Sequence, residues 1–218
     1  MTSANNKSAE KPPKKTYSQD EIDLLVPQLL ESYPADFPSE LTSNVFPFWL
    51  TWKPTPNKPP PKTTKILKKP VHADWQNIAN LTTYDTVHNI IAKKNKPFGY
   101  GFVYHEAHPF VCIDIDLATD DNHALLEKLN SYTEWSPSSK GLHTIVRVPT
   151  LLDKLTLIDV FGNGKRNQSE YRDLFIATGY VTVTGRLLPI TQSDVRMHSV
   201  DDLIDILSPY FKSNISSL

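Results

Sequence analysis

Several features that would narrow the class of this protein are scarce in its sequence. A single cysteine, Cys112, in 218 residues excludes an internal disulfide and a zinc site built from several cysteines. No apolar run approaches the roughly 18 residues of a membrane-spanning helix. The first residues lack a secretory pattern, so we expect a cytoplasmic protein without membrane contact. Neither sign of charge dominates: 23 Lys and Arg against 24 Asp and Glu exclude a globally basic nucleic-acid coat but allow a local basic surface.

One such basic surface is indicated by residues 41–73, which contain no Asp or Glu but six lysines, preceded by aromatic residues. The prolines that follow Trp52 predict an extended loop and exclude a helix. Cations beside aromatic side chains on an extended loop can follow a phosphate backbone. One interpretation is therefore a DNA-contacting surface, and the other is a solvated loop. The lysines proposed as contacts are Lys53, Lys65, Lys68 and Lys69.

Local patterns predict a mixture of helices and strands. Ser18 and Glu21 form a capping-box pattern before an amphipathic helix, in which Pro27 predicts a kink or a break. We interpret this helix as a packing or docking element, separate from any chemistry. Further helices are expected at 83–94, 124–129 and after Ser199 through Leu207. Strands are expected at 46–52, 99–105, 110–116, 132–135, 142–148, 157–161, 171–176 and 181–184, the last two forming a pair around Gly179. Because these elements do not alternate strictly, the fold class is α/β of the α+β kind.

The sharpest chemical feature is the strand that carries Asp114 and Asp116. Residues i and i+2 of a strand face the same way, so both carboxylates lie on one face. Two neighbouring carboxylates repel unless a cation lies between them, and hard oxygen ligands favour Mg²⁺ or Mn²⁺. The alternative is an edge strand whose acids simply face water.

A loop rich in serine follows this strand, and it ends in Gly141-Leu142-His143. Its backbone N–H groups, its hydroxyls and Lys140 are the components of an anion-binding site. Ser138, Lys140 and His143 are the residues that we expect to contact the anion. A third carboxylate would complete the site: Asp173 is the first candidate and Glu170 the second. Three carboxylates that hold two metal ions are the arrangement for in-line nucleotidyl transfer.

These segments together carry a resemblance to a known family. The series CIDID, then SPSSKGLH, then RDLF followed by GYVTVTG resembles the catalytic core of the archaeo-eukaryotic primase superfamily. The most similar variety is the primase-polymerase domain of phages, plasmids and other mobile elements. Asp114 and Asp116 match its first motif and the segment Gly141–His143 its second. Asp173 matches the third motif, because it lies nine residues before the Thr-Val-Thr-Gly run. Ser139 departs from the family, which commonly has glycine there, and the lysine-rich proline loop is unusually elaborate.

The resemblance implies a fold and a domain organisation. An RRM-like sheet that bears the acids would pack on a smaller α/β module. We expect a disordered basic tail over residues 1–16, an N-terminal helical segment over 17–40, the catalytic domain over 41–195 and a C-terminal helix over 196–218.

The implied function is that of a DNA primase or primase-polymerase, which copies a single-stranded DNA template by a two-metal mechanism. Asp114, Asp116 and Asp173 would bind two Mg²⁺ or Mn²⁺ ions. Nucleoside triphosphates, ribo or deoxy, would be the substrates, held by Ser138, Lys140, His143 and, more weakly, Arg172; Lys165 and Arg166 would be further DNA contacts. A separate replicative helicase, or a longer parent protein, is implied because no helicase follows the core. The alternatives are a non-catalytic protein that binds single-stranded DNA through Trp49, Trp52 or Trp135, or recruits a helicase, and a metal-dependent nuclease.

Overall fold

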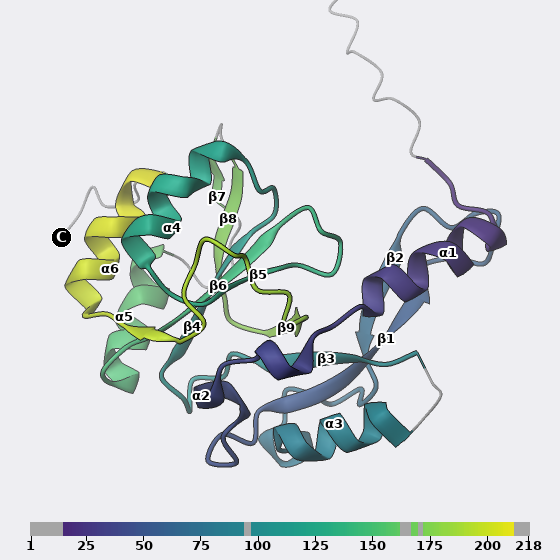
Figure 1. Ribbon diagram of the computed structural model, residues 1–218, viewed down its shortest axis with the longest axis horizontal. Coiled ribbons are helices and arrows are strands. Elements are labelled where there is room, and N and C mark those ends of the chain that lie inside the picture. Colours follow the sequence, from purple (N-terminus) through teal and green to yellow (C-terminus); the bar gives the residue numbers. More distant parts are fainter. Residues whose placement is uncertain (1–14, 94–96, 162–166, 170–171, 212–218) are drawn as a thin grey trace, which may run out of the picture.

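Two sheets, which Figure 1 shows meeting near the middle of the molecule, form the frame of the protein. This computed structural model describes residues 15–93, 97–161, 167–169 and 172–211. The first sheet has the order β2-β1-β3-β9 and the second the order β10-β6-β4-β8-β7, with β5 also paired to β6. The first sheet consists of β1 (Trp49–Pro56), β2 (Ile66–Pro70), β3 (Gly99–Val103) and β9 (Tyr180–Val183). The second consists of β4 (Phe110–Ile115), β5 (Thr133–Trp135), β6 (Leu142–Arg147), β7 (Asn167–Ser169), β8 (Arg172–Ala177) and β10 (Arg196–Met197).

Helices cover the outer faces of both sheets. In Figure 1, α4, α5 and α6 form a layer on one side of the second sheet, and α3 packs against β1 and β3 of the first. The helices are α1 (Gln19–Leu30), α2 (Ser39–Thr42), α3 (Tyr84–Lys93), α4 (His123–Leu129), α5 (Leu151–Phe161) and α6 (Val200–Leu207). Single 3-10 turns lie at Pro34–Asp36, Ile78–Asn80, Asp120–Asn122 and Ser208–Tyr210. The expected mixed fold is therefore confirmed.

Each face of the second sheet borders a different core. Ile113 and Ile115 of β4 pack with the apolar sides of α4, α5 and α6 in one core. Cys112, on the alternate face of β4, packs in the other core with residues of the first sheet such as Trp49 and Phe102. Because Asp114 alternates with Ile113 and Ile115, it belongs to the face that looks toward the first sheet. The fold thus directs the polar residues of β4 inward, between the two sheets.

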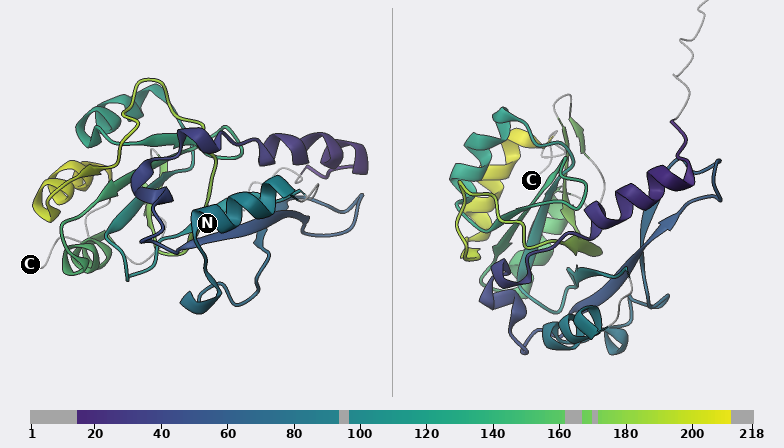
Figure 2. Two further views of the ribbon diagram at one scale, coloured as in Figure 1. Left: turned by 60° about the horizontal axis from the view of Figure 1, so that its bottom comes forward. Right: turned by 45° about the vertical axis from the view of Figure 1, so that its right-hand side comes forward.

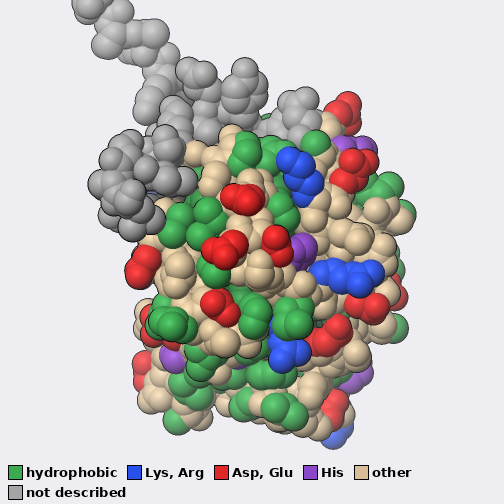
Figure 3. All heavy atoms as spheres, turned by 90° about the vertical axis from the view of Figure 1, so that its left-hand side faces the viewer, with side chains coloured by type: hydrophobic (Ala, Val, Ile, Leu, Met, Phe, Trp, Pro, Cys, Tyr) green, Lys and Arg blue, Asp and Glu red, His purple; other side chains and the backbone are tan. Residues whose placement is uncertain are grey.

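The outer surface of the α4–α6 layer has a different character. Figure 3 shows it as a mixture of hydrophobic and acidic side chains, with fewer basic ones. Leu152 is 71% exposed on α5, and the carboxylates of Asp201, Asp202 and Asp205 on α6 are exposed as well. An acidic surface of this kind repels polyanions.

Several elements that the sequence predicts are confirmed. Ser18 accepts the N–H of Glu21 and Glu21 accepts the N–H of Ser18, which is the predicted capping box at the start of α1. The helix continues through Pro27 to Leu30 without a break. Ser199 likewise caps α6 by accepting the N–H of Asp202. No helix in the described parts of the chain is long and apolar enough to cross a membrane. The basic tail predicted for 1–16 falls almost entirely outside the described residues.

Three expectations about local structure are wrong. Residues 157–161 end helix α5 and do not form a strand: Lys154, Leu157, Ile158 and Phe161 are buried at helical spacing. The sequence does not show a clear helical repeat of apolar residues here, because Lys154 occupies one of the buried positions. A signal was available, since Thr150 and Asp153 cap α5 by accepting each other's backbone N–H.

The other two errors concern pairing. The strands on either side of Gly179 do not pair: β8 pairs with β4, and β9 pairs with β3 in the other sheet. The predicted proline loop is in part a strand, because β1 runs through Pro54 to Pro56. Over these residues β1 has β2 as its partner but has passed the end of β3, so a missing proline N–H costs little there.

Candidate active site

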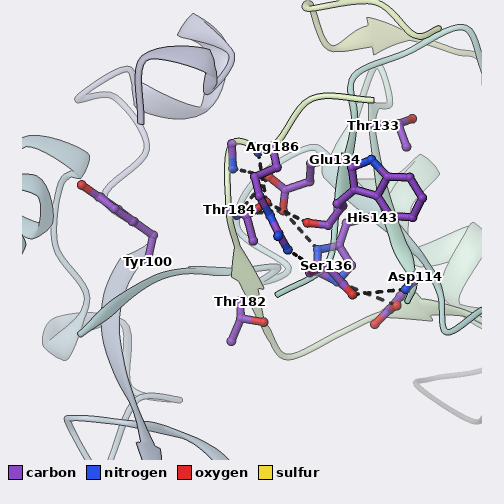
Figure 4. A network of polar contacts seen from close by, with 12 residues as sticks. Tyr100, Asp114, Thr133, Glu134, Ser136, His143, Thr182, Thr184 and Arg186 are labelled. Carbon is purple, nitrogen blue, oxygen red and sulfur yellow. Dashed lines mark hydrogen bonds and ion pairs between the residues drawn. The ribbon is translucent and has the colours of Figure 1, made fainter. Parts of the chain in front are cut away.

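Three polar side chains lie on one row across three neighbouring strands. Asp114 of β4 stands opposite His143 of β6, and His143 stands opposite Glu134 of β5. Directly opposed residues of antiparallel strands share a face, so all three belong to the face that looks toward the first sheet. The imidazole Nδ1 of His143 lies 3.1 Å from Oε1 of Glu134, and its Nε2 lies 3.9 Å from Oδ1 of Asp114 (Figure 4). His143 is thereby placed between two carboxylates.

Glu134 is completely buried and acts as the anchor of this row. Its two oxygens accept the backbone N–H of Thr184, and Oε2 also accepts the N–H of Gly185 and the hydroxyl of Tyr132. All of these partners are donors, as expected of an ionised carboxylate, so Nδ1 of His143 carries the hydrogen shared with Oε1. Burial, and secondarily the charge of Glu134, raise the pKa of Tyr132, which keeps its hydroxyl protonated. Nε2 is consequently the ring nitrogen presented to Asp114.

The same contacts explain the Thr-Val-Thr-Gly run at the end of β9. Thr184 donates its hydroxyl to the carbonyl of Trp135 at 2.7 Å, in addition to its bond with Glu134. Gly185 has a positive φ of 69° and approaches the carbonyl of Tyr33 so closely that a Cβ would overlap it. The run therefore joins the end of the first sheet to β5 of the second, beside His143. Sequence reasoning missed Glu134, because its role depends on the register of β5 against β6.

A cavity of about 410 Å³ opens between the sheets at this row. Asp114 and His143 line it from the second sheet, and Lys68, Tyr180 and Thr182 line it from the first. Lys68 donates from Nζ to Oγ1 of Thr182 at 3.4 Å. Burial lowers the pKa of Lys68, while the charges of Asp114 and Asp116 oppose that shift. The cavity therefore has the carboxylate of Asp114 on one wall and the amine of Lys68 on the other.

The chain positions of the three predicted acids lie at the same end of the second sheet. Asp116 follows the last residue of β4 and is half-buried, like Asp114. On β8, Leu174 pairs with Ile115 and Phe175 pairs with Asp114, so position 173 lies one step beyond the end of β4. The side chain of Asp173 and the competing Glu170 lie outside the described part of the structure. Among the side chains that are described, no three His, Cys, Asp or Glu residues form a metal-binding group. The assignment of the third acid stays a prediction.

The serine-rich loop is held firmly beside the end of β4. Arg186 donates from Nη1 to Oγ of Ser139 at 2.9 Å and from Nη2 to the carbonyl of Ser136. The N–H of Ala118, just after β4, donates to the carbonyl of Lys140 at 2.7 Å. Ser139 has a φ of 55°, the left-handed conformation that glycine adopts most readily. This backbone conformation explains why glycine suits the position. Serine adopts it here at some conformational cost.

The loop does not place all of the predicted anion contacts in one cavity. His143 lines the 410 Å³ cavity, whereas Ser138 and Lys140 are exposed and line a second cavity of about 270 Å³. Arg172 begins β8 opposite Ser169, and its side chain is outside the described part. The predicted anion-binding set is therefore divided between two neighbouring cavities.

Comparison with known proteins finds one partial similarity that bears on this site. The chain is similar to a phage primase-polymerase. Over 99 residues, 41% of this chain, it is 32% identical to a protein described as a DNA primase-polymerase from Nitratiruptor phage NrS-1. The matched stretch is 13% of that protein, so the similarity concerns a small part of it. No protein-family model matches the chain.

The lysines of residues 41–73 do not lie on one surface. Lys53 and Lys69 are exposed and directly opposite each other on β1 and β2. Lys68 alternates with Lys69 and therefore points to the other face, into the 410 Å³ cavity. Lys65 is exposed and lines the second cavity. Lys165 and Arg166 lie outside the described residues.

The tryptophans proposed as stacking platforms are in part unsuitable for that role. Trp49 is 0% and Trp52 1% exposed, and their indole N–H groups donate to the carbonyls of Leu41 and Tyr100. Trp52 covers Gly99, where any larger residue would collide with the indole ring. Trp135 is half-buried against the core beneath α4–α6. The expectation that Trp49 or Trp52 stacks on DNA is wrong, because both rings are needed to fill the core.

Proposed function

We propose that this chain carries the catalytic domain of a DNA primase-polymerase of a phage, plasmid or other mobile element. The reaction would be template-directed transfer of nucleotides on single-stranded DNA. The observation that carries the proposal is the 410 Å³ cavity, where Asp114 and His143 face Lys68 across the two sheets. The motif order and the partial similarity to a phage primase-polymerase support it. A separate helicase that delivers the template is part of the proposal.

The residues present fit a pair of divalent ions. Asp114 and Asp116 offer hard carboxylate oxygens, and position 173 lies on the adjacent strand at the same end of the sheet. The charges of Asp114 and Asp116 both act to raise the pKa of Lys68, so both carboxylates lie within electrostatic range of that lysine. The chemistry that bound Mg²⁺ or Mn²⁺ ions supply is activation of the primer hydroxyl and neutralisation of the triphosphate and the leaving pyrophosphate. Asp114, Asp116 and Asp173 would hold them.

The other residues of the cavity would position the anionic substrate. His143 presents Nε2 to the cavity because Glu134 accepts the hydrogen on Nδ1. An imidazole held in this way can donate to a phosphate oxygen when Nε2 is protonated, and Glu134 stabilises the resulting cation. Lys68 supplies a second cation from the opposite wall. Ser138 and Lys140, and Arg172 more weakly, would contact the triphosphate from the loop and from β8.

Synthesis on a DNA template tests this proposal directly. Unprimed and primed single-stranded DNA would be incubated with Mg²⁺ or Mn²⁺ and labelled ribo- or deoxynucleotides. We expect metal-dependent products from the natural chain and none from Asp116→Ala, with an unchanged thermal unfolding profile. Asp205→Ala, which removes an exposed carboxylate on α6, is the matched control and should retain full synthesis. Synthesis by Asp116→Ala at the natural rate would refute the assignment.

A further inference from the structure

One of the four tryptophans, Trp75, lies at the margin of the core and not inside it. Trp49 and Trp52 are fully buried, whereas Trp75 is half-buried on the segment between β2 and α3. The left-hand view of Figure 2 shows this segment as a loop that stands out from the first sheet. Val71 and Ile78 of the same loop are exposed. Part of an aromatic ring is thus accessible from solvent on an exposed loop.

Trp75 stands at the rim of the 410 Å³ cavity. Its ring meets the ring of Tyr180 edge to face, with the two ring centroids 5.1 Å apart. Tyr180 lines the cavity, and so does Gly179, where a Cβ would lie 3.4 Å from the indole of Trp75. The hydroxyl of Tyr180 donates to the carbonyl of Lys68 on β2. The indole is therefore held beside the cavity by a ring that is itself anchored.

The wall of the cavity next to Trp75 is the edge of a strand. Six consecutive residues, 177–182, line the cavity. Because side chains alternate along an extended chain, an unbroken run of lining residues means that the backbone itself borders the cavity. Within the described part of the chain, β9 pairs with β3 alone, and its other edge faces the cavity. Such an edge presents N–H and C=O groups that can bond to the polar rim of a flat ligand.

An aromatic rim, a polar chain edge and a cation match the parts of an unpaired nucleotide. A nucleobase stacks its faces on aromatic rings, and its edge carries donors and acceptors. Lys68 lines the same cavity and supplies a cation for the phosphate. Among the described residues that line the cavity, Asp114 is the only carboxylate, and it belongs to the wall on the second sheet. Aromatic rings beside cations are the combination by which proteins hold single-stranded nucleic acid without regard to its sequence.

We propose that Trp75, supported by Tyr180, is a stacking platform for an unpaired base of single-stranded DNA at the rim of the 410 Å³ cavity. This inference rests on the proposed function, in which single-stranded DNA is the template. It assigns stacking to a tryptophan other than Trp49 and Trp52, and it gives the loop between β2 and α3 a role in holding the template. Stacking tolerates any base, so the platform should favour no particular sequence.

Comparison of two oligomers measures stacking apart from phosphate contacts. One is a labelled oligodeoxythymidylate, and the other is an abasic oligomer of the same length, which keeps the phosphates and lacks the bases. We expect the full natural chain to bind the abasic oligomer about tenfold more weakly, which corresponds to about 1.4 kcal/mol. Trp75→Leu should bind both oligomers with nearly the same Kd. Ile78→Ala, which changes another exposed apolar residue of the loop, is the matched control and should keep the natural ratio. The natural ratio in Trp75→Leu would overturn the inference.

A second variant keeps the test decisive if Trp75→Leu folds poorly. Trp75→Phe retains an aromatic ring, so its affinity for the oligodeoxythymidylate should fall only about two- to threefold. It should also lose the quenching of tryptophan fluorescence that the bound oligomer causes in the natural chain, because Trp49 and Trp52 are buried and do not meet a base. Quenching of the natural size in Trp75→Phe would place the contact at another tryptophan and overturn the inference.

Three further results separate this inference from related ones. Binding of deoxythymidine triphosphate should be equal in the natural chain and in Trp75→Leu. Loss of that binding, with the oligomer ratio unchanged, would assign the ring to the base of the incoming nucleotide and overturn the inference. Synthesis by a natural chain that does not distinguish the two oligomers would overturn the inference and leave the proposed function standing. Base-dependent binding through Trp75 without any synthesis would count against the proposed function alone.

Discussion

Replacement of Glu134 by glutamine is the sharpest probe of the row that positions His143. The substitution keeps the size of the side chain and removes its charge. An amide oxygen at the Oε2 position can still accept from Thr184, Gly185 and Tyr132. The amide nitrogen at the Oε1 position is a donor, so it opposes the N–H of Thr184 and cannot accept from His143. His143 must then move its hydrogen from Nδ1 to Nε2.

The size of the effect follows from these contacts. A hydrogen bond to a charged group contributes about 1.5–3 kcal/mol, and Glu134 is fully buried, so water does not replace the lost bond. We expect the free energy of unfolding of Glu134→Gln to fall by about 2–3 kcal/mol. For a chain of this length the Tm falls by about 4–12 °C. Loss of the contact that orients the imidazole of His143 should lower primer extension about 10- to 100-fold.

Three assays check this prediction against a matched variant. Urea unfolding measures stability, primer extension measures activity, and nitrogen-15 NMR of the imidazole reports which nitrogen carries the hydrogen. Tyr132→Phe removes one donor to Oε2 and leaves the Glu134–His143 contact in place. It should lose about 1 kcal/mol of stability and keep the natural imidazole spectrum. Natural stability together with an unchanged imidazole spectrum in Glu134→Gln would refute this account of Glu134.

Two further predictions concern the buried Lys154 and Gly141 of the serine-rich loop. Burial lowers the pKa of Lys154 from 10.5 to about 7. Between pH 7 and pH 10.5 the unfolded chain therefore binds more protons than the folded chain. The free energy of unfolding should rise with pH over this range, by a few kcal/mol at most. Urea unfolding at pH 7 and pH 9.5 should show this rise for the natural chain and no such rise for Lys154→Met. An equal rise in both proteins would exclude Lys154 as the cause. Gly141→Ala would drive a Cβ into the carbonyl of Ile115 at the end of β4, costing about 1–3 kcal/mol of unfolding free energy. Gly179→Ala meets only a ring atom of Trp75 at 3.4 Å and should be close to neutral, so equal losses in the two would contradict this reading of the loop.

Much of the local structure follows from short-range patterns that act within a few residues. The capping residues Ser18 and Ser199 fix where their helices begin, because a side-chain oxygen satisfies a free N–H of the first turn. The alternation around Asp114 placed it on the face opposite Ile113 and Ile115, as the two cores confirm. Such features depend on backbone geometry alone, so the sequence predicts them well.

Strand pairing and side-chain burial could not be predicted from such short-range patterns. Nothing local distinguishes a hairpin around Gly179 from a crossover between two sheets, and the crossover is what brings Thr182 to the cavity that Asp114 lines. The sequence does not predict helix α5 because a lysine is rarely buried, so Lys154 does not count as part of an apolar face. Its Nζ donates to the carbonyls of His105 and His108, which are far away in the sequence. These are long-range contacts, which only the folded chain reveals.

The sequence by itself determined that Asp114 and Asp116 stand two residues apart at the end of a strand, that a serine-rich loop leads into His143, and that the fold is of the mixed class. Each of these rests on the identity and spacing of neighbouring residues. The tertiary structure alone decided that Glu134 orients His143, that Lys68 faces Asp114 while Lys69 does not, and that α1 closes a cavity beside the loop. These three facts depend on strand register and on how two sheets pack, and those are set by the burial of the whole core and not by any local pattern.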